Sequence, residues 1–357
     1  MGNNPREIHL GDLENNLNSE FVVFKKHKFQ YLNEKAIFRD ENIISNEISR
    51  LIFFFRVLKN FKTVHYNFGR TIFSPAYSNP LKRIWFLSNI LRSAYNGYQQ
   101  LMRIIELSLF KLLGKTLTVT YQGDDGRQKK FSLENFEYTF ADKVSEEYYP
   151  KFSDLEKKFK AKLFNLFMDR IYCVNPDLNW VLPKKTQFLP YAHNVRGFKF
   201  IKRDFKRISF LHCPSNSKVK GTNRILEALK SLKRDYDFDL ILAEGTSHKK
   251  VLELIKENSI LIDQLYCGWY GGISVEAMRT GMPSLCYIRN EDLKNIPKEM
   301  EKELPIININ QDNLQETLYG ILSGKFDLQK ISTQSFNYAQ KWHDRKLISK
   351  IINKCVE

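Results

Sequence analysis

A glycine-rich turn in the second half of the chain carries residues that could bind a phosphate and a sugar. Residues 268–283 read Gly-Trp-Tyr-Gly-Gly-Ile-Ser-Val-Glu-Ala-Met-Arg-Thr-Gly-Met-Pro. A helical pattern begins directly after Gly271 and Gly272, so the free N–H groups of its first turn, including that of Ile273, could bind an anion. Glu276 lies further along this helix, where its carboxylate could accept from sugar or ribose hydroxyls. The same pattern also occurs in ordinary strand-to-helix connections.

A second loop places two lysines at the start of another helix. Residues 213–223 read Cys-Pro-Ser-Asn-Ser-Lys-Val-Lys-Gly-Thr-Asn. Lys218 and Lys220 could neutralise a pyrophosphate there, and Gly221 would allow its close approach. The alternative is a solvated surface loop in which Thr222 caps the helix. The loop does not match the Walker A sequence, which disfavours ATP hydrolysis of the P-loop kind.

The elements that must position these loops alternate along the chain. In the first half we expect strands at 21–24, 62–67, 115–121, 169–174 and 185–189, and helices at 43–59, 81–112 and from Pro176. In the second half we expect strands at 208–213, 238–243, 259–262 and 283–288, and helices at 222–234, 247–257, 273–280, 311–323 and 333–354. The charged segment 196–207 lacks an apolar period and is typical of a linker. Strands that alternate with helices predict two α/β units with parallel sheets.

Composition narrows the class of protein. The chain has 357 residues, 43% hydrophobic and 27% charged, which excludes a disordered or collagen-like protein. Its net charge of +16 indicates an anionic partner, which could be nucleic acid, a membrane surface or a phosphorylated ligand. We find no helix-turn-helix, zinc-finger or RNP-type aromatic pattern, so nucleic acid is not expected.

Cysteines and apolar segments bear on the cellular environment. The five cysteines are spread singly without a C-x-x-C pair, which predicts neither a zinc site nor a disulfide framework. No uncharged apolar stretch approaches the roughly 20 residues of a membrane span, and the amino terminus is polar. We therefore expect a cytoplasmic protein, either soluble or peripheral on the inner face of the membrane.

Residues 51–100 combine cations with aromatic side chains. This stretch holds seven Lys or Arg and no acid, together with Phe53, Phe54, Phe55 and Trp85. Such a surface could dock on anionic lipid, because each cation near the lipid contributes roughly 1 kcal/mol and the aromatic rings bury apolar area. The alternative is that the phenylalanines belong to the core and the cations only coat it.

Several motifs together resemble glycosyltransferase family 4. Its carboxy-terminal donor domain is matched by Lys220-Gly-Thr, Glu244-Gly245, Asp263, the Gly-Trp-Tyr-Gly turn at 268–271, Glu276-Ala-Met and Gly281-Met-Pro283. Its acceptor-side domain is matched more loosely by 64–69 and 115–127, and its domain-closing region by 175–191. The similarity covers most of the chain from about residue 60 to 330.

This resemblance implies the GT-B architecture, an α/β fold in which two Rossmann-like domains face each other across a cleft. The implied division is an acceptor-side domain at 1–198, a donor domain at 199–330 and a helix at 331–357 that packs back toward the first domain. The implied reaction is a retaining transfer from a nucleotide-sugar to a glycan or lipid-linked acceptor, as in surface polysaccharide or glycoconjugate synthesis. Neither a cofactor nor a divalent metal is expected, and an anionic membrane surface is a further expected partner.

Site roles follow from the same resemblance. Glu276 matches the carboxylate that holds the nucleotide ribose, Lys220 faces the donor phosphates, and the amides of Gly271 and Gly272 face the phosphate near the reacting bond. The family's first motif glutamate would stand at position 268, which is Gly268 here. That departure leaves open an alternative, a catalytically degenerate GT-B protein that binds nucleotide or glycan without turnover.

Five further residues would face the same cleft. Asp125 is expected to contact the acceptor or the sugar, with Arg127 beside it, although aspartates in turns also form local hydrogen bonds. His65 and His212 sit at strand ends, where the alternative is a hydrogen-bonded core histidine. Glu244, at another strand end, is a secondary candidate.

Overall fold

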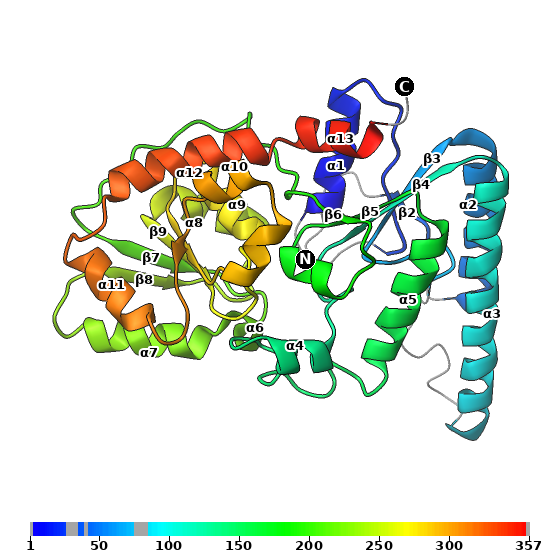
Figure 1. The fold of residues 1–357 in the computed structure, drawn as a ribbon, viewed down its shortest axis with the longest axis horizontal. Helices are drawn as coiled ribbons and strands as arrows, with labels where there is room; N and C mark the ends of the chain where they lie inside the picture. The colour runs from blue at the N-terminus through cyan, green and yellow to red at the C-terminus, as the bar shows by residue number, and fades with distance from the viewer. Residues whose placement is uncertain (1–2, 26–34, 39–41, 75–84, 355–357) are drawn as a thin grey trace.

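Two parallel β-sheets, each covered by helices, form the framework of the computed structural model (Figure 1). The structure describes residues 3–25, 35–38, 42–74 and 85–354. Among these residues the two large sheets have four and five strands, and a third sheet has two. The prediction of an α/β protein with parallel sheets is confirmed.

The first sheet contains the strands of the first half of the chain. Its order is β3 (Thr63–Asn67), β4 (Thr116–Tyr121), β5 (Arg170–Cys173) and β6 (Thr186–Phe188). Its helices include α2 (Ile43–Asn60), α3 (Trp85–Leu112), α4 (Lys129–Asn135) and α5 (Ser153–Phe167). Neighbouring strands are parallel in a register that pairs Val119 with Ile171. The small sheet pairs β1 (Val22–Val23) with β2 (Lys35–Ala36).

The second sheet has the order β11 (Ile307–Asn308), β10 (Ser284–Cys286), β9 (Ile260–Gln264), β7 (Ser209–His212) and β8 (Asp239–Leu242). Its helices include α6 (Ser217–Lys220), α7 (Thr222–Leu232), α8 (His248–Glu257), α9 (Gly272–Met278), α10 (Lys298–Glu303) and α11 (Leu314–Leu322). Every residue of the inner strand β9 is buried. The parallel strands all end at one edge, which brings the loop before α6 and the turn before α9 to the same place.

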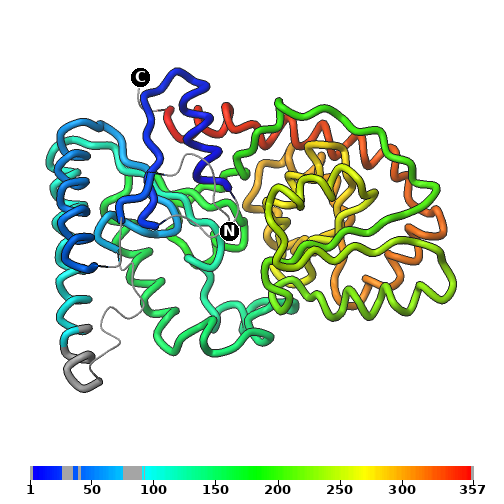
Figure 2. The backbone as a smooth tube through the Cα atoms, turned by 180° about the vertical axis from the view of Figure 1, so that it is seen from behind, coloured from blue at the N-terminus to red at the C-terminus, as the bar shows by residue number. Residues whose placement is uncertain are grey.

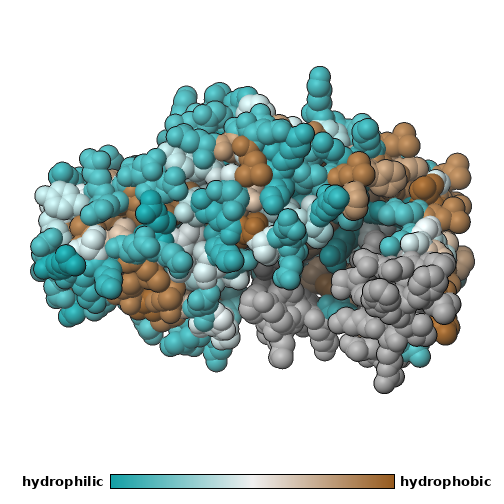
Figure 3. All heavy atoms as spheres, turned by 90° about the horizontal axis from the view of Figure 1, so that it is seen from below, coloured by the Kyte–Doolittle hydropathy of each residue, from teal (hydrophilic) through white to brown (hydrophobic). Residues whose placement is uncertain are grey.

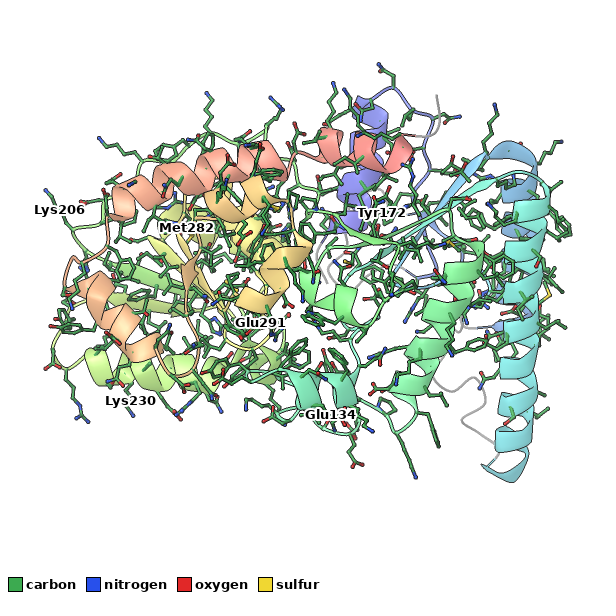
Figure 4. The ribbon with its side chains drawn as sticks, in the orientation of Figure 1. Glu134, Tyr172, Lys206, Lys230, Met282 and Glu291 are labelled. Atoms are coloured by element: carbon green, nitrogen blue, oxygen red, sulfur yellow. The ribbon has the colours of Figure 1, made fainter. Side chains whose placement is uncertain are left out.

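The chain ends meet beside the first sheet. The prediction of one helix over 333–354 is wrong, because α12 (Leu328–Trp342) ends before His343 and α13 (Arg345–Asn353) begins after Asp344. The Asp344 side chain caps the new helix by accepting from the backbone N–H of Lys346, at 3.0 Å. Helix α13 then packs on α1 (Asn4–Glu14), as both ribbon and tube show (Figures 1 and 2). Figure 4 labels Tyr172 of β5 close to α13, where its hydroxyl donates to the carbonyl of Ile351.

Two short 3-10 helices join the halves. The segments are η1 (Pro176–Trp180) and η2 (Asn290–Asn295). The indole Nε1 of Trp180 donates to Asp292 at 2.7 Å, and Asn295 donates to the carbonyl of Pro176 at 3.1 Å. A shared hydrophobic cluster adds Val174 and Tyr191 of the first half to the residues around Trp269. These contacts hold the strand ends of the two sheets against each other.

Candidate functional site

Asp263 organises the glycine-rich turn from the end of β9. Its side chain is fully buried and forms an ion pair with Lys220. The other carboxylate oxygen accepts from the backbone N–H of Gly271, at 2.7 Å, and from the hydroxyl of Ser274, at 2.8 Å. One buried carboxylate therefore fixes the lysine loop and the start of α9 relative to each other.

The charges of this ion pair stabilise one another. Burial alone would raise the pKa of Asp263, but the attraction of Lys220 and the donated hydrogen bonds outweigh it and lower that pKa. Burial would likewise lower the pKa of Lys220, but Asp263 raises it. Both groups are thus charged at neutral pH, and Lys220 presents a fixed cation beside the turn.

The glycines of the turn leave room where side chains would project. A Cβ atom at Gly271 would lie 3.5 Å from Nζ of Lys220, and one at Gly272 would lie 3.4 Å from Nε2 of His193. At Gly221 the backbone is left-handed, with φ of +75°, and a Cβ would lie 2.9 Å from the Tyr266 ring. Glycine is therefore required where α6 meets α7, directly after Lys220.

Glu276 forms a hydrogen bond with His248, a residue that the sequence analysis does not predict as part of the site. The carboxylate of this almost fully buried residue contacts Nε2 of His248 at 2.7 Å. The hydrogen bond with Glu276 raises the pKa of His248, although burial opposes it. Burial would raise the pKa of Glu276, but His248 lowers it. Glu276 is thus ionised and lies beside the glycine-rich turn, although it forms no ion pair with Lys220.

We expect His248→Ala to destabilise the protein more at pH 5.5 than at pH 8.5. The raised pKa means that the folded state favours protonated His248, so its contribution is full below the unfolded pKa of 6.5 and disappears as pH rises through the folded value. The difference should be about 1 kcal/mol, the scale of a partly exposed ion pair. Urea unfolding of both proteins at both pH values measures it, and an equal loss at both would contradict the pairing.

His193 faces the same turn from the first half of the chain. Its backbone, between β6 and β7, accepts from the N–H of Arg345 and donates to the carbonyl of His343. Its ring is almost fully buried, and burial lowers its pKa to about 3, so the imidazole is neutral. No sequence signal points to it, because its position depends on how the segment after β6 crosses to α13.

An arginine occupies the space beside Gly268. The backbone there is left-handed, with φ of +77°, and a Cβ would lie 2.6 Å from Nη1 of Arg289. The guanidinium of Arg289 donates to Asp292 at 2.8 Å and to the carbonyl of Tyr138 at 3.1 Å, and it stacks on the Phe136 ring. A glutamate at position 268 would therefore collide with a buried cation, which explains the glycine in this chain.

The predicted site residues Asp125 and Arg127 form their hydrogen bonds and ion pairs with nearby residues of the first half of the chain. The carboxylate of Asp125 accepts from the backbone N–H groups of Gln122, at 3.0 Å, and Gly123, at 2.7 Å, so it shapes its own loop. Burial raises the pKa of Asp125 to about 6. Arg127 pairs with Asp177, at 2.6 Å. The structure does not bring Asp125 or Arg127 into contact with Lys220.

Both predicted histidines are hydrogen-bonded inside the sheets. The ring of His65 contacts the hydroxyls of Thr118 at 2.7 Å and Thr120 at 3.1 Å, and burial lowers its pKa to about 4. His212 contacts the carbonyl of Ile262 at 2.8 Å and the hydroxyl of Thr222 at 2.9 Å. His212 is fully buried, as the alternative of a core histidine expects, whereas His65 is half-buried on β3.

The remaining predicted residues lie at the rim. Lys218 is exposed on α6, and the exposed Glu244 accepts from the hydroxyl of Ser217. Ile273 is half-buried in the first turn of α9. The structure thus gathers Lys220, the turn before α9 and Glu276, with Lys218 and Glu244 on the solvent side.

The described part of the chain contains no group of three or more His, Cys, Asp or Glu side chains that could hold a metal ion. None of the described helices combines the length and apolar character that a bilayer crossing requires.

Solved structures of similar fold cover almost the whole chain. HepE from Anabaena in complex with UDP gives a TM-score of 0.62 at 10% identity, covering 99% of this chain and 96% of the other. Its complex with UDP-glucose gives 0.59 at 10% identity, with 98% and 94% covered. A glycosyltransferase from Rickettsia africae gives 0.59 at 11% identity, with 98% and 92% covered. No family model and no curated protein sequence matches the chain.

The likeness extends over both sheets and the helices between them. Two parallel sheets joined in one chain, with helices on their faces and loops of both halves in contact, are described above for this protein. The similar structures cover both halves at once rather than one of them. The chain therefore has the GT-B fold seen in glycosyltransferases, as the sequence predicted.

Proposed function

We propose that this chain is a retaining glycosyltransferase that moves a sugar from a nucleotide-sugar donor to a glycan or lipid-linked acceptor. The observation that carries the proposal is the cluster of Lys220, Asp263 and the turn at Gly271, placed at the strand ends of the second sheet. The UDP and UDP-glucose complexes of the similar HepE structures support a nucleotide-sugar as the donor.

The proposed chemistry is electrostatic. When the bond between sugar and nucleotide breaks, negative charge develops on the diphosphate and the sugar gains oxocarbenium character. The cation of Lys220 and the N–H groups at Gly272 and Ile273 would stabilise the leaving diphosphate. Glu276 would accept from the ribose hydroxyls, and the neutral ring of His193 would face the phosphates from the other side.

Retention would result from attack on the face that the diphosphate leaves. The departing phosphate oxygen would take the proton of the acceptor hydroxyl while the new bond forms, so no protein nucleophile is required. The cation and amides that hold the diphosphate need no divalent metal for this step. We accordingly propose that the enzyme needs neither a metal nor a cofactor.

The second candidate is a GT-B protein that binds a nucleotide or glycan without turnover. It is favoured by Arg289, whose guanidinium fills the space beside Gly268 where the resembled family carries a carboxylate. A protein that lacks this carboxylate could retain the diphosphate cluster and still fail to activate the sugar. Binding and turnover must therefore be measured separately.

We expect UDP, but not UMP, to raise the melting temperature of the protein clearly, because the proposed site binds a diphosphate in the folded state only. Release of UDP from UDP-glucose, with and without candidate acceptors, then tests turnover. The rate should be the same in EDTA as in buffer. Activity that EDTA abolishes and manganese restores would contradict metal independence, and a UDP shift without turnover of any nucleotide-sugar would favour the second candidate.

We further propose that one face of α2 lies on an anionic membrane surface at the cytoplasmic side, near a lipid-linked acceptor. Ile44, Ile48, Ile52 and Phe55 recur every three or four residues and are all exposed, so they form one apolar stripe. Brown apolar surface gathers at the end of the molecule that holds α2 and α3 (Figure 3). Phe54 belongs to the core instead, and residues 75–84 of the predicted basic stretch lie outside the described residues.

Co-sedimentation with anionic vesicles tests this surface. The wild type should pellet with vesicles of phosphatidylglycerol at low salt and remain in the supernatant at high salt. Ile52→Glu combined with Phe55→Glu should abolish pelleting, whereas Leu347→Glu, an exposed leucine on α13, should not. Equal recovery of the wild type in the supernatant with and without vesicles would contradict the proposal.

A further inference from the structure

A cavity of about 460 Å³ opens beside the edge strand β3, between the start of α1, strand β1 and helix α2. Its size is that of a small-molecule site. Most of its wall is apolar, with Phe21, Val23, Phe53, Val57, Val64 and Ile72 among the lining residues. Of the predicted site residues only His65 lines this cavity, and the proposed donor chemistry does not use it.

The polar end of the cavity lies toward the proposed donor site. Asn67, which ends β3, and Arg6 of α1 line it there. The next residue, Glu7, pairs with Arg345 at 2.7 Å, and its charge also acts on His248. Helix α1 therefore lines the cavity through Arg6 and contacts α13 through the pair of Glu7 and Arg345.

The apolar end continues to the surface of α2. A neighbouring hollow of about 470 Å³ shares Val22, Ile37 and Phe53 with the cavity. Its wall also includes Ile48 and Ile52, which are 52% and 64% exposed on the apolar stripe of α2. The two hollows adjoin at an ion-pair cluster, because Glu20 of the cavity wall pairs with Arg56 and Lys35 of the neighbouring hollow.

The charges around the cavity favour an anion. Arg6, Lys25 and Arg70 line it, and Arg70 is exposed and forms no ion pair with any described residue. Among the described lining residues the one acid is Glu20, which already pairs with Arg56 and Lys35. The described lining residues thus combine a mostly apolar wall with more cations than acids, and Arg70 is the cation without an ion pair among the described residues.

We propose that this cavity binds the hydrocarbon chain of an amphiphilic acceptor, a long-chain alkyl or prenyl phosphate, and that Arg70 binds the phosphate. The assignment deepens the proposed glycosyl transfer, on which it rests, by naming the acceptor class. The tail lies along the apolar wall of the cavity, and the phosphate end comes to the carboxyl edge of the first sheet. The part of the acceptor beyond the phosphate then extends toward the donor site.

Calorimetric titration with monomeric hexadecyl phosphate tests this proposal. Parallel titrations use hexadecanol, which lacks the phosphate, and inorganic phosphate, which lacks the hydrocarbon chain. Hexadecyl phosphate should bind at least about tenfold more tightly than hexadecanol, because its phosphate adds a charge-assisted contact with Arg70 to the apolar burial that both ligands share. Inorganic phosphate alone should show no binding here, since the apolar wall supplies the rest of the affinity. Equal affinities for hexadecyl phosphate and hexadecanol would overturn the role of Arg70.

Three variants separate the parts of the site. Val23→Trp fills the cavity from strand β1 and should lower the affinity for hexadecyl phosphate by at least about tenfold. Arg70→Glu should lower that affinity by a similar factor without changing the affinity for hexadecanol. Lys62→Glu is the matched control, because Lys62 is an exposed cation near β3 that does not line the cavity, and it should change neither affinity.

The change in melting temperature caused by UDP should be measured for the wild type and for each variant beside its calorimetric titration. An unchanged UDP shift in Val23→Trp and Arg70→Glu shows that both variants are folded and keep the donor site. Wild-type affinity for hexadecyl phosphate in Val23→Trp would overturn the cavity as the binding site. A wild type that binds hexadecyl phosphate but shows no UDP shift would instead contradict the proposed function and leave the amphiphile site standing.

Discussion

Replacing Lys220 with methionine should lower the rate of sugar transfer by about 10²–10³-fold, the usual effect of removing one group that stabilises transition-state charge. Lys220 is the cation held beside the turn at Gly271, and methionine keeps the length of its side chain without the charge. The effect should fall mainly on kcat, because the charge on the leaving diphosphate is greatest as the bond breaks. Lys230→Met is the control, since that exposed lysine lies on α7 and has no part in the proposed site.

Loss of stability must be separated from loss of catalysis in this experiment. Lys220→Met leaves the buried carboxylate of Asp263 without its cation, although the N–H of Gly271 and the hydroxyl of Ser274 still donate to it. Circular dichroism and the melting temperature of each variant should therefore be recorded beside its rate. A folded Lys220→Met variant as active as the wild type and Lys230→Met would show that the proposed diphosphate site is wrong.

The architecture of the second half is largely predictable from sequence because its signals are local. Residues 260–262 are all apolar, and β9, which contains them, is buried along its whole length. The glycine turn that follows marks where the strand stops and α9 begins. Helix α5 is missing from the sequence reading because its lysines interrupt the apolar period, and only Ala161 and Phe164 are buried in it.

Sequence motifs predict some residues of the candidate site, whereas the positions of others depend on contacts between segments far apart in the sequence. Lys220 and the turn at Gly271 each stand beside a predicted helix start, and the family resemblance implies that both face the donor phosphates. The part played by Arg289 beside Gly268 depends on how the chain packs after β10, and the approach of His193 depends on the crossing between the two halves. Asp125 shows the converse, because its position after a strand is consistent both with a site contact and with the local turn that the structure contains.

Asp263→Ala should cost the protein about 3–5 kcal/mol of unfolding free energy, the usual consequence of removing one partner of a buried ion pair. The substitution would leave three donors without their acceptor, namely Lys220, the N–H of Gly271 and the hydroxyl of Ser274. Because the pKa of Asp263 is lowered in the folded state, its contribution is full above the unfolded value of 3.8 and is lost as pH falls through the folded value. Urea unfolding at pH 7 measures the loss.

A double-mutant cycle with Lys220→Met shows whether that loss comes from the pair itself. If Asp263 mainly holds Lys220, Asp263→Ala should destabilise the Lys220→Met background by clearly less than the wild type, because the cation is already gone. The difference should reach about 1 kcal/mol or more, as for residues that share one network. Equal losses in both backgrounds would mean that Asp263 acts through Gly271 and Ser274 alone. The lysine would then be free to move, and its fixed position beside the turn could not be the basis of diphosphate binding.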